Sequence, residues 1–265
     1  MSALEMREVV KEYRLRDGLR TTRLRAVDNV SFELQPGRTI ALVGQSGSGK
    51  STIAKLLLQL ERPTSGEILV DGAPMQYRGA GAATYRKAVQ MVFQDPFASL
   101  NPYHSIAHHL ARPVKLHHPG FSREQVAERV LELLRRVRLD EDFAHRKPHE
   151  LSGGQRQRVA IARALAPEPA ILVADEPVSM LDVSIRLGVL NLLATLQREE
   201  NLGVLYITHD LATARHFSDE IMVLLHGVVV EHGPADDVIL NPQHEYTQLL
   251  AEAAPAPERR LAELS

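Results

Sequence analysis

Glycine, lysine and serine between residues 44 and 51 have the spacing of a phosphate-binding loop. The stretch reads GQSGSGKS and lies between an apolar run at 39–43, which predicts a buried strand, and residues 52–60, which predict a helix. Glycines let the backbone turn so that successive N–H groups point at one anion, and the helix dipole adds positive potential. The Lys50 side chain can reach β- and γ-phosphates, and the Ser51 hydroxyl can bind Mg²⁺. The predicted phosphate-binding residues are Gly44, Gln45, Ser46, Gly47, Ser48, Gly49, Lys50, Ser51 and Thr52.

An acidic pair follows a second apolar run, residues 171–174. Asp175 would end this strand at the edge where open α/β sheets bind ligands, so it is a candidate Mg²⁺ ligand. Glu176 comes next and can polarise a water that attacks the γ-phosphate. Two adjacent carboxylates after a strand can also be a solvated turn. The phosphate-binding loop upstream favours the catalytic interpretation.

A second helix start with the character of an anion site lies at residues 151–155, LSGGQ. Ser152 suits the N-cap position of a helix predicted over residues 156–166, and Gly153 and Gly154 expose backbone N–H groups. One nucleotide needs one phosphate-binding loop, so a second phosphate-binding surface requires another explanation. It could bind a nucleotide that is held by another molecule.

The composition excludes several classes of function. The 265 residues are 44% hydrophobic and 24% charged, as expected of a soluble globular protein with one large domain or a domain with an insertion. Lys plus Arg number 31 against 33 Asp plus Glu, so bulk charge gives no basis for nucleic-acid binding. The absence of cysteine excludes disulfides, iron–sulfur clusters and thiol chemistry. We expect neither a signal peptide nor a membrane-spanning run.

The sequence contains LSGGQ as well as the phosphate-binding loop and the acidic pair, and in this combination it resembles the nucleotide-binding subunits of ATP-binding cassette (ABC) importers. The resemblance covers nearly the whole chain and implies ATP hydrolysis coupled to transport. The catalytic residues that it implies are Glu176, His209 and Gln94. Besides the phosphate-binding loop, the implied ATP contacts are Tyr13, Ser152, Gly153, Gly154, Gln155 and Asp182. The implied Mg²⁺ ligands are Ser51, Gln94 and Asp175.

Four of these assignments depend on the resemblance more than on their own chemistry. Tyr13 resembles the aromatic residue that stacks on adenine, although a half-buried strand aromatic is the alternative. Gln94 resembles the glutamine that contacts Mg²⁺ or water and senses the membrane partner. His209 resembles the histidine that contacts the γ-phosphate, whereas a lone histidine after a strand is usually structural. Residues 179–182 resemble the D-loop, with Met180 where alanine is common.

The implied fold is α/β: a RecA-like P-loop NTPase core with an N-terminal antiparallel β portion and an inserted α-helical subdomain. Strand and helix patterns alternate outside residues 95–167, whereas that stretch has helical patterns and no strand runs. Residues 79–83, GAGAA, predict a loop. The predicted division is a nucleotide-binding domain over 1–250, with its core at 1–94 and 168–240 and its helical subdomain at 95–167, and a C-terminal extension and tail over 241–265.

Three stretches point to one subfamily. Residues 92–102 (VFQDPFASLNP), 182–185 (DVSI) and 241–250 (NPQHEYTQLL) are similar to segments of oligopeptide, dipeptide and nickel importers. Glu245 stands where proline is usual in the last of them. The resemblance therefore implies a peptide as the solute, with nickel second.

The histidines raise the alternative of a metal site. His104 and His108 have the i, i+4 spacing of one helix face, and His109 lies next to them. Solvated residues of the helical subdomain are the stronger interpretation.

The implied partners are two membrane-spanning permease subunits, a second ATP-binding subunit and, indirectly, an extracytoplasmic solute-binding protein. The chain would lie at the cytoplasmic face of the cell membrane and bind no nucleic acid. The rival hypothesis is a soluble cassette ATPase that acts on nucleic acid or ribosomes, but such proteins usually fuse two cassettes or insert a coiled coil. This chain has one P-loop and no heptad run. LSGGQ argues against a third class, the P-loop kinases and GTPases.

Overall fold

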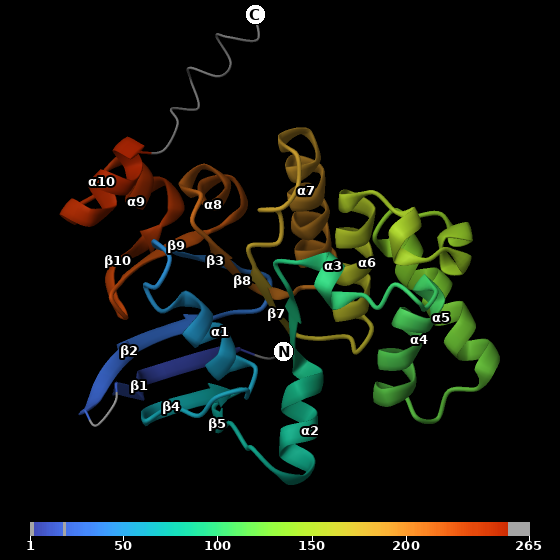
Figure 1. Ribbon diagram of the computed structural model, residues 1–265, viewed down its shortest axis with the longest axis horizontal. Coiled ribbons are helices and arrows are strands. Elements are labelled where there is room, and N and C mark those ends of the chain that lie inside the picture. Colours follow the sequence, from blue (N-terminus) through green and yellow to red (C-terminus); the bar gives the residue numbers. More distant parts are fainter. Residues whose placement is uncertain (1–2, 18–19, 254–265) are drawn as a thin grey trace, which may run out of the picture.

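A computed structural model of the protein describes residues 3–17 and 20–253, whose strands form two sheets with helices around them (Figure 1). The smaller sheet is antiparallel, in the order β2-β1-β4-β5. Its strands are β1 (Leu4–Asp17), β2 (Arg20–Leu34), β4 (Ser65–Val70) and β5 (Ala73–Pro74). The expected antiparallel portion near the N-terminus is therefore present.

The larger sheet has the order β10-β9-β3-β8-β7-β6. All neighbouring pairs are parallel except β9 and β10, which form an edge hairpin. Its strands are β3 (Thr39–Val43), β6 (Val89–Val92), β7 (Ile171–Asp175), β8 (Gly203–Thr208), β9 (Glu220–Leu225) and β10 (Val228–Pro234). Because parallel strands end at the same edge, the loops after β3, β6, β7 and β8 meet there.

Both faces of this sheet are covered, which explains why its strands read as unbroken apolar runs. Along β3, Ile40 and Leu42 belong to one buried cluster, which includes the antiparallel sheet and helix α1 (Lys50–Leu57). Ala41 and Val43 belong to the other cluster, on the side of the remaining helices. The same alternation continues in β7 and β8. The two clusters thus fix β3 and α1, the elements on either side of the phosphate-binding loop.

Helices fill the stretch between β6 and β7, and they lie on the opposite side of the molecule from β9 and β10 (Figure 1). They are α3 (Pro96–Ser99), α4 (Ile106–His117), α5 (Arg123–Arg136), the 3₁₀ helices η1 (Glu141–His145) and η2 (Pro148–Glu150), and α6 (Gly153–Leu165). The other helices are α2 (Gly79–Ala88), α7 (Val183–Glu199), α8 (Leu211–Phe217), α9 (Ala235–Leu240) and α10 (Glu245–Ala253). In the part of the chain that the structure describes, no helix is long and apolar enough to span a membrane.

Serine residues cap two of these helices, and the sequence predicts the cap of α6. Ser122 caps α5: its hydroxyl accepts from the Gln125 N–H, and the Gln125 side chain accepts from the Ser122 N–H. Ser152 makes the same reciprocal pair with Gln155. Because of this pair α6 begins at Gly153, three residues before the predicted start, and the glycines of LSGGQ form its first turn.

Two local predictions are wrong, and packing explains one of them. Residues 79–83 were expected to form a loop but make the first half of α2, because Ala82 and Tyr85 are buried and the Tyr85 hydroxyl donates to the Leu57 carbonyl at 2.6 Å. Helix α1 ends at Leu57 instead of residue 60, since Gln59 adopts a left-handed backbone (φ 58°). Of the predicted C-terminal extension and tail, residues 254–265 lie outside the described residues.

Candidate nucleotide-binding site

The loop after β3 has the curled backbone that its glycines predict. Gly47 and Gly49 have φ of +82° and +113°, which L side chains rarely adopt. A Cβ on Gly49 would also lie 2.3 Å from the Ala26 carbonyl oxygen, so no larger residue fits there. Helix α1 begins at the next residue, Lys50, and its free N–H groups face the loop. The segment can therefore present several backbone donors to an anion.

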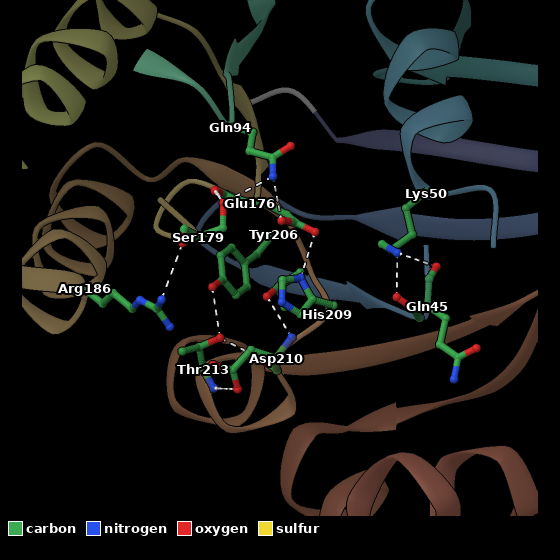
Figure 2. Close-up of polar contacts among 12 residues, drawn as sticks. Gln45, Lys50, Gln94, Glu176, Ser179, Arg186, Tyr206, His209, Asp210 and Thr213 are labelled. Carbon is green, nitrogen blue, oxygen red and sulfur yellow. Dashed lines mark hydrogen bonds and ion pairs between the residues drawn. The ribbon is translucent and has the colours of Figure 1, made fainter. Parts of the chain in front are cut away.

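The Lys50 side chain is buried inside this loop. Its ammonium group donates to the carbonyl oxygens of Gly44 (2.6 Å) and Gln45 (2.9 Å), as Figure 2 shows. Burial lowers the pKa of Lys50, and the carboxylates of Glu176 and Asp175 act in the opposite direction. A desolvated cation held by neutral carbonyls gains strongly from a phosphate in their place.

Asp175, at the end of β7, is also largely removed from water. Burial raises the pKa of its carboxyl group, the neighbouring Glu176 charge raises it further, and Lys50 lowers it. An additional cation at this position would relieve the cost of keeping Asp175 ionised. Asp175, Ser51 and Gln94 line one cavity and offer carboxylate, hydroxyl and amide oxygens, the ligand types that Mg²⁺ prefers. Within 3–17 and 20–253 no group of three or more His, Cys, Asp or Glu side chains could hold a metal ion.

Glu176 lies at the centre of a small polar network (Figure 2). Its backbone is left-handed (φ 43°), and its N–H donates to the Ile207 carbonyl of β8 at 2.8 Å. One carboxylate oxygen pairs with His209 Nδ1 at 2.9 Å, and the other accepts from Gln94 Nε2 at 3.0 Å. Three loops, after β6, β7 and β8, thus bring together the three residues that were predicted to be catalytic. The side chain of Glu176 is 18% exposed, and that of His209 is 63% exposed.

One cavity of about 470 Å³ joins most of the predicted site. This volume lies within the range of small-molecule sites. Tyr13 lies at one end of the cavity, next to Leu24, its partner across β1 and β2. The cavity is lined by Tyr13, Leu24, Ala26, Ser46, Gly47, Gly49, Lys50, Ser51, Thr52, Gln94, Asp175, Glu176 and His209.

Eight predicted contacts do not line this cavity: Gly44, Gln45 and Ser48 of the phosphate-binding loop itself, and the five residues Ser152 to Gln155 and Asp182. The LSGGQ residues Ser152 to Gln155 lie at the start of α6, with Ser152 exposed. Gly154 packs against Ile185 of α7 so closely that a Cβ would be 2.5 Å from it. Asp182 is the N-cap residue of α7 on this neighbouring segment. Among the residues predicted to touch ATP, these five therefore form a separate surface of the chain.

Sequence reasoning missed several residues at the site. Leu24 and Ala26 line the cavity together with Tyr13. The alternation of side-chain directions along β2, which pairs Leu24 with Tyr13, could have indicated them. Tyr246 of α10 was noted only as part of a C-terminal motif, yet its hydroxyl oxygen lies 2.9 Å from the Gln45 backbone nitrogen. No local pattern relates these two residues, which are 201 positions apart.

Comparison with known proteins identifies the family of this chain. The sequence model of the family described as ABC transporter matches residues 27–179, from β2 to the residues after Glu176. The chain belongs to the ABC transporter family. The match includes the phosphate-binding loop, Gln94, LSGGQ and the acidic pair.

Two relatives in this family carry import or transport names. The chain is 46% identical over 256 residues to the glutathione import ATP-binding protein GsiA of Salmonella typhimurium, covering 95% of this chain and 41% of that protein. It is 45% identical over 262 residues to the oligopeptide transport ATP-binding protein AppF of Bacillus subtilis, covering 97% of this chain and 79% of that protein. The chain thus spans about two fifths of the length of the GsiA proteins.

A solved structure agrees with the fold. The dimeric post-hydrolysis structure of the ATP-binding cassette MJ0796, bound to ADP and Pi, superimposes with a TM-score of 0.76 at 34% identity. The match covers 88% of this chain and 98% of that one. The ABC cassette fold that the sequence resemblance implied is therefore confirmed.

Replacing Asp175 tests the electrostatics of the site. Burial raises the pKa of Asp175 above its value in the unfolded chain. The contribution of this carboxyl group to the free energy of unfolding is therefore fully present below the unfolded pKa and is lost as pH rises through the folded pKa. Without nucleotide or Mg²⁺, Asp175→Asn should therefore raise the melting temperature by roughly 1–3 °C near neutral pH. The gain should shrink as pH falls. Thermal melts at a series of pH values measure it.

The matched control is Asp140→Asn, an exposed aspartate whose side chain makes no cap hydrogen bond. It should leave the melting temperature within about 1 °C of the wild type at neutral pH. A lower melting temperature for Asp175→Asn at neutral pH would contradict the view that this carboxylate is held at a cost.

Proposed function

We propose that the chain is the ATP-hydrolysing subunit of an ABC importer, and that it drives uptake of a solute of the peptide class, with nickel as the second choice. The observation that carries the proposal is the carboxylate of Glu176, held by His209 and Gln94 at a cavity lined by the phosphate-binding loop. The import and transport names of the GsiA and AppF relatives support the direction and the class of solute.

The proposed binding mode places the adenine of ATP against Tyr13 and the phosphates over the loop before α1. Lys50 exchanges the carbonyls of Gly44 and Gln45 for the β- and γ-phosphates, a change that its burial favours. Ser51, Asp175 and Gln94 would hold Mg²⁺, which supplies positive charge next to the phosphates.

In the proposed chemistry, Glu176 orients the attacking water and accepts its proton as the bond to the γ-phosphate forms. The His209 imidazole, already 2.9 Å from the Glu176 carboxylate, contacts the γ-phosphate. Gln94 holds the other carboxylate oxygen and thereby fixes the orientation of the base. The products are ADP and inorganic phosphate.

Each ATP is proposed to lie between two cassettes. The LSGGQ surface has the exposed N-cap of α6 and does not line the cavity of its own chain. The Ser152–Gln155 pair uses the N–H groups of those two residues, which leaves the Gly153 and Gly154 N–H groups to serve the ATP of a second cassette. Asp182 lies on the neighbouring segment and belongs to the same proposed interface. The second cassette is a copy of this chain or a similar one, and the dimeric MJ0796 structure supports such a pairing.

The membrane partners are proposed to dock at a groove of about 1010 Å³ between the core and the helices after β6. Three exposed apolar side chains, Leu60, Phe93 and Leu116, line it. Gln94 and Asp175 line both this groove and the nucleotide cavity. A permease segment seated in the groove would therefore touch the catalytic network, which is the physical requirement for coupling.

The whole assembly is proposed to contain two permease subunits, two cassettes and, indirectly, a solute-binding protein, with this chain peripheral at the cytoplasmic face of the membrane. The division into a core at 1–94 and 168–240, a helical subdomain at 95–167 and an extension at 241–265 belongs to the same proposal. A cassette ATPase acting on nucleic acid or ribosomes is not favoured, because both named relatives are import or transport proteins.

Glu176→Gln tests the catalytic role. The amide retains the size of the side chain but cannot accept the water proton, so ATP binding should persist while turnover falls roughly 10²–10⁴-fold. Steady-state ATPase assays and MgATP titrations measure the two quantities. Glu168→Gln, which removes a half-exposed carboxylate paired with Arg129, is the matched control and should hydrolyse ATP normally. Turnover within about threefold of wild type would remove Glu176 from the role of base.

Ser152→Arg tests the sharing of each ATP between cassettes. In the assembled transporter, the bulky cation should prevent closure of the cassettes and abolish ATP-driven transport. It should leave ATP affinity at the chain's own loop nearly unchanged, because Ser152 does not line that cavity. Loss of ATP binding by the isolated variant would contradict a shared site.

A cross-link reports the same interface directly. The chain has no cysteine, so Ser46→Cys in one cassette and a cysteine at position 152 of the other are unique thiols. In the Glu176→Gln background the disulfide should form with ATP and not without it, since ATP favours the closed dimer only while it is intact. Equal cross-linking with and without ATP would exclude the proposed mechanism.

Leu116→Glu tests the docking groove. A charge on this 74% exposed apolar residue should release the chain from membrane vesicles that carry its permease subunits, because the apolar contact is lost. ATP affinity should not change. Leu240→Glu, on α9 outside the groove, is the matched control and should sediment with the vesicles as wild type does. Identical sedimentation of both variants would place the permease elsewhere.

A further inference from the structure

The C-terminal helix α10 reaches the phosphate-binding loop through one side chain. The Tyr246 hydroxyl accepts a hydrogen bond from the Gln45 N–H at 2.9 Å, and its ring belongs to the buried cluster on the helical side of the large sheet. The residue is 9% exposed. The contact is thus partly shielded from competing water.

The start of α10 is itself tied to the sheet. The carboxylate of Glu231, on β10, accepts from the backbone N–H groups of Gln243 (2.9 Å) and His244 (3.1 Å). His244 Nδ1 in turn accepts from the Tyr246 N–H at 3.1 Å. These bonds fix the first turn of the helix, so the Tyr246 hydroxyl is aimed at the loop by a rigid support.

The contact acts on the part of the loop that holds the lysine. The Gln45 N–H points to Tyr246, while the carbonyls of Gly44 and Gln45 both accept from Lys50 Nζ. A Cβ on Gly44 would lie 2.3 Å from the Leu224 carbonyl oxygen, so this corner of the loop is also pressed against β9. Tyr246, the Gln45 peptide and Lys50 therefore form one continuous polar chain.

We propose that Tyr246 is a positioning residue for ATP: it fixes the first peptides of the phosphate-binding loop, whose carbonyls hold Lys50 until ATP binds. Without the hydroxyl the loop would have to be ordered by the nucleotide itself, and that cost reduces affinity. Glu176 and His209 are oriented by a separate network, so the loss falls on ATP affinity and KM, with a smaller effect on kcat. The C-terminal segment at 241–250 thus serves the nucleotide site. The inference depends on ATP binding by this chain and not on transport.

Tyr246→Phe removes one oxygen and retains the ring. Loss of one buried hydrogen bond to the loop should weaken MgATP binding about 3–10-fold in calorimetric titrations of the full chain. The KM for ATP should rise by a similar factor in steady-state assays, and kcat should change less than KM. An unchanged dissociation constant, or a loss confined to kcat, would overturn the proposal.

Tyr85→Phe is the matched control. It also removes a buried tyrosine hydroxyl bonded to the backbone, but at the far end of α1, where the partner is the Leu57 carbonyl. It should lower stability to a similar degree and leave MgATP affinity within about twofold of wild type. If both variants weaken ATP binding equally, the effect of Tyr246 is one of general stability and the proposal is wrong.

Amide hydrogen exchange without nucleotide gives a direct readout. The Gln45 amide should be protected in the wild type and in Tyr85→Phe, and it should exchange at least several-fold faster in Tyr246→Phe. If Tyr246→Phe does not fold, hydrogen exchange of the wild type still tests the contact, because an unprotected Gln45 amide would contradict it.

The outcomes separate this inference from the proposed function. A wild-type chain that fails to bind MgATP would refute the function. A wild-type chain that binds MgATP, together with a Tyr246→Phe variant that binds it equally well, would refute only the positioning role.

Discussion

The parallel pairing of β3, β6, β7 and β8 is the constraint on which the rest of the site depends. Each strand ends at the same edge of the sheet, so loops that are far apart in sequence meet there: the phosphate-binding loop, Gln94, the acidic pair and His209. Burial on both faces fixes the register, because a slip by one residue would exchange the two apolar clusters. The catalytic geometry is thus a consequence of how the core packs.

The same packing buries charged side chains at the edge of the sheet, where keeping them ionised costs free energy. Lys50 and Asp175 are both withdrawn from water, which lowers the pKa of the first and raises that of the second, and their mutual attraction offsets only part of this effect. Oppositely charged groups arranged in this way favour a ligand that brings both a polyanion and a cation. MgATP, the ligand proposed above, has that composition, so the charges that disfavour the site without ligand would favour its binding.

Segments outside the parallel sheet complete the site. The antiparallel sheet supplies Tyr13, Leu24 and Ala26 along one wall of the cavity, while the C-terminal helix contacts the phosphate-binding loop through Tyr246. The large groove beside the helices after β6 shares Gln94 with the nucleotide cavity. The cavity is therefore connected by short chains of contacts both to the groove and to helix α10.

The sequence by itself determined the elements whose signals are local. The glycines of the loop, the apolar run before Asp175 and the serine cap of α6 each act within a few residues, so their patterns predicted the structure. Only the tertiary structure decided that residues 79–83 are helical and that Tyr246 contacts Gln45. Those outcomes depend on contacts between segments tens to hundreds of residues apart, and no short pattern in the sequence records which distant surfaces will pack together.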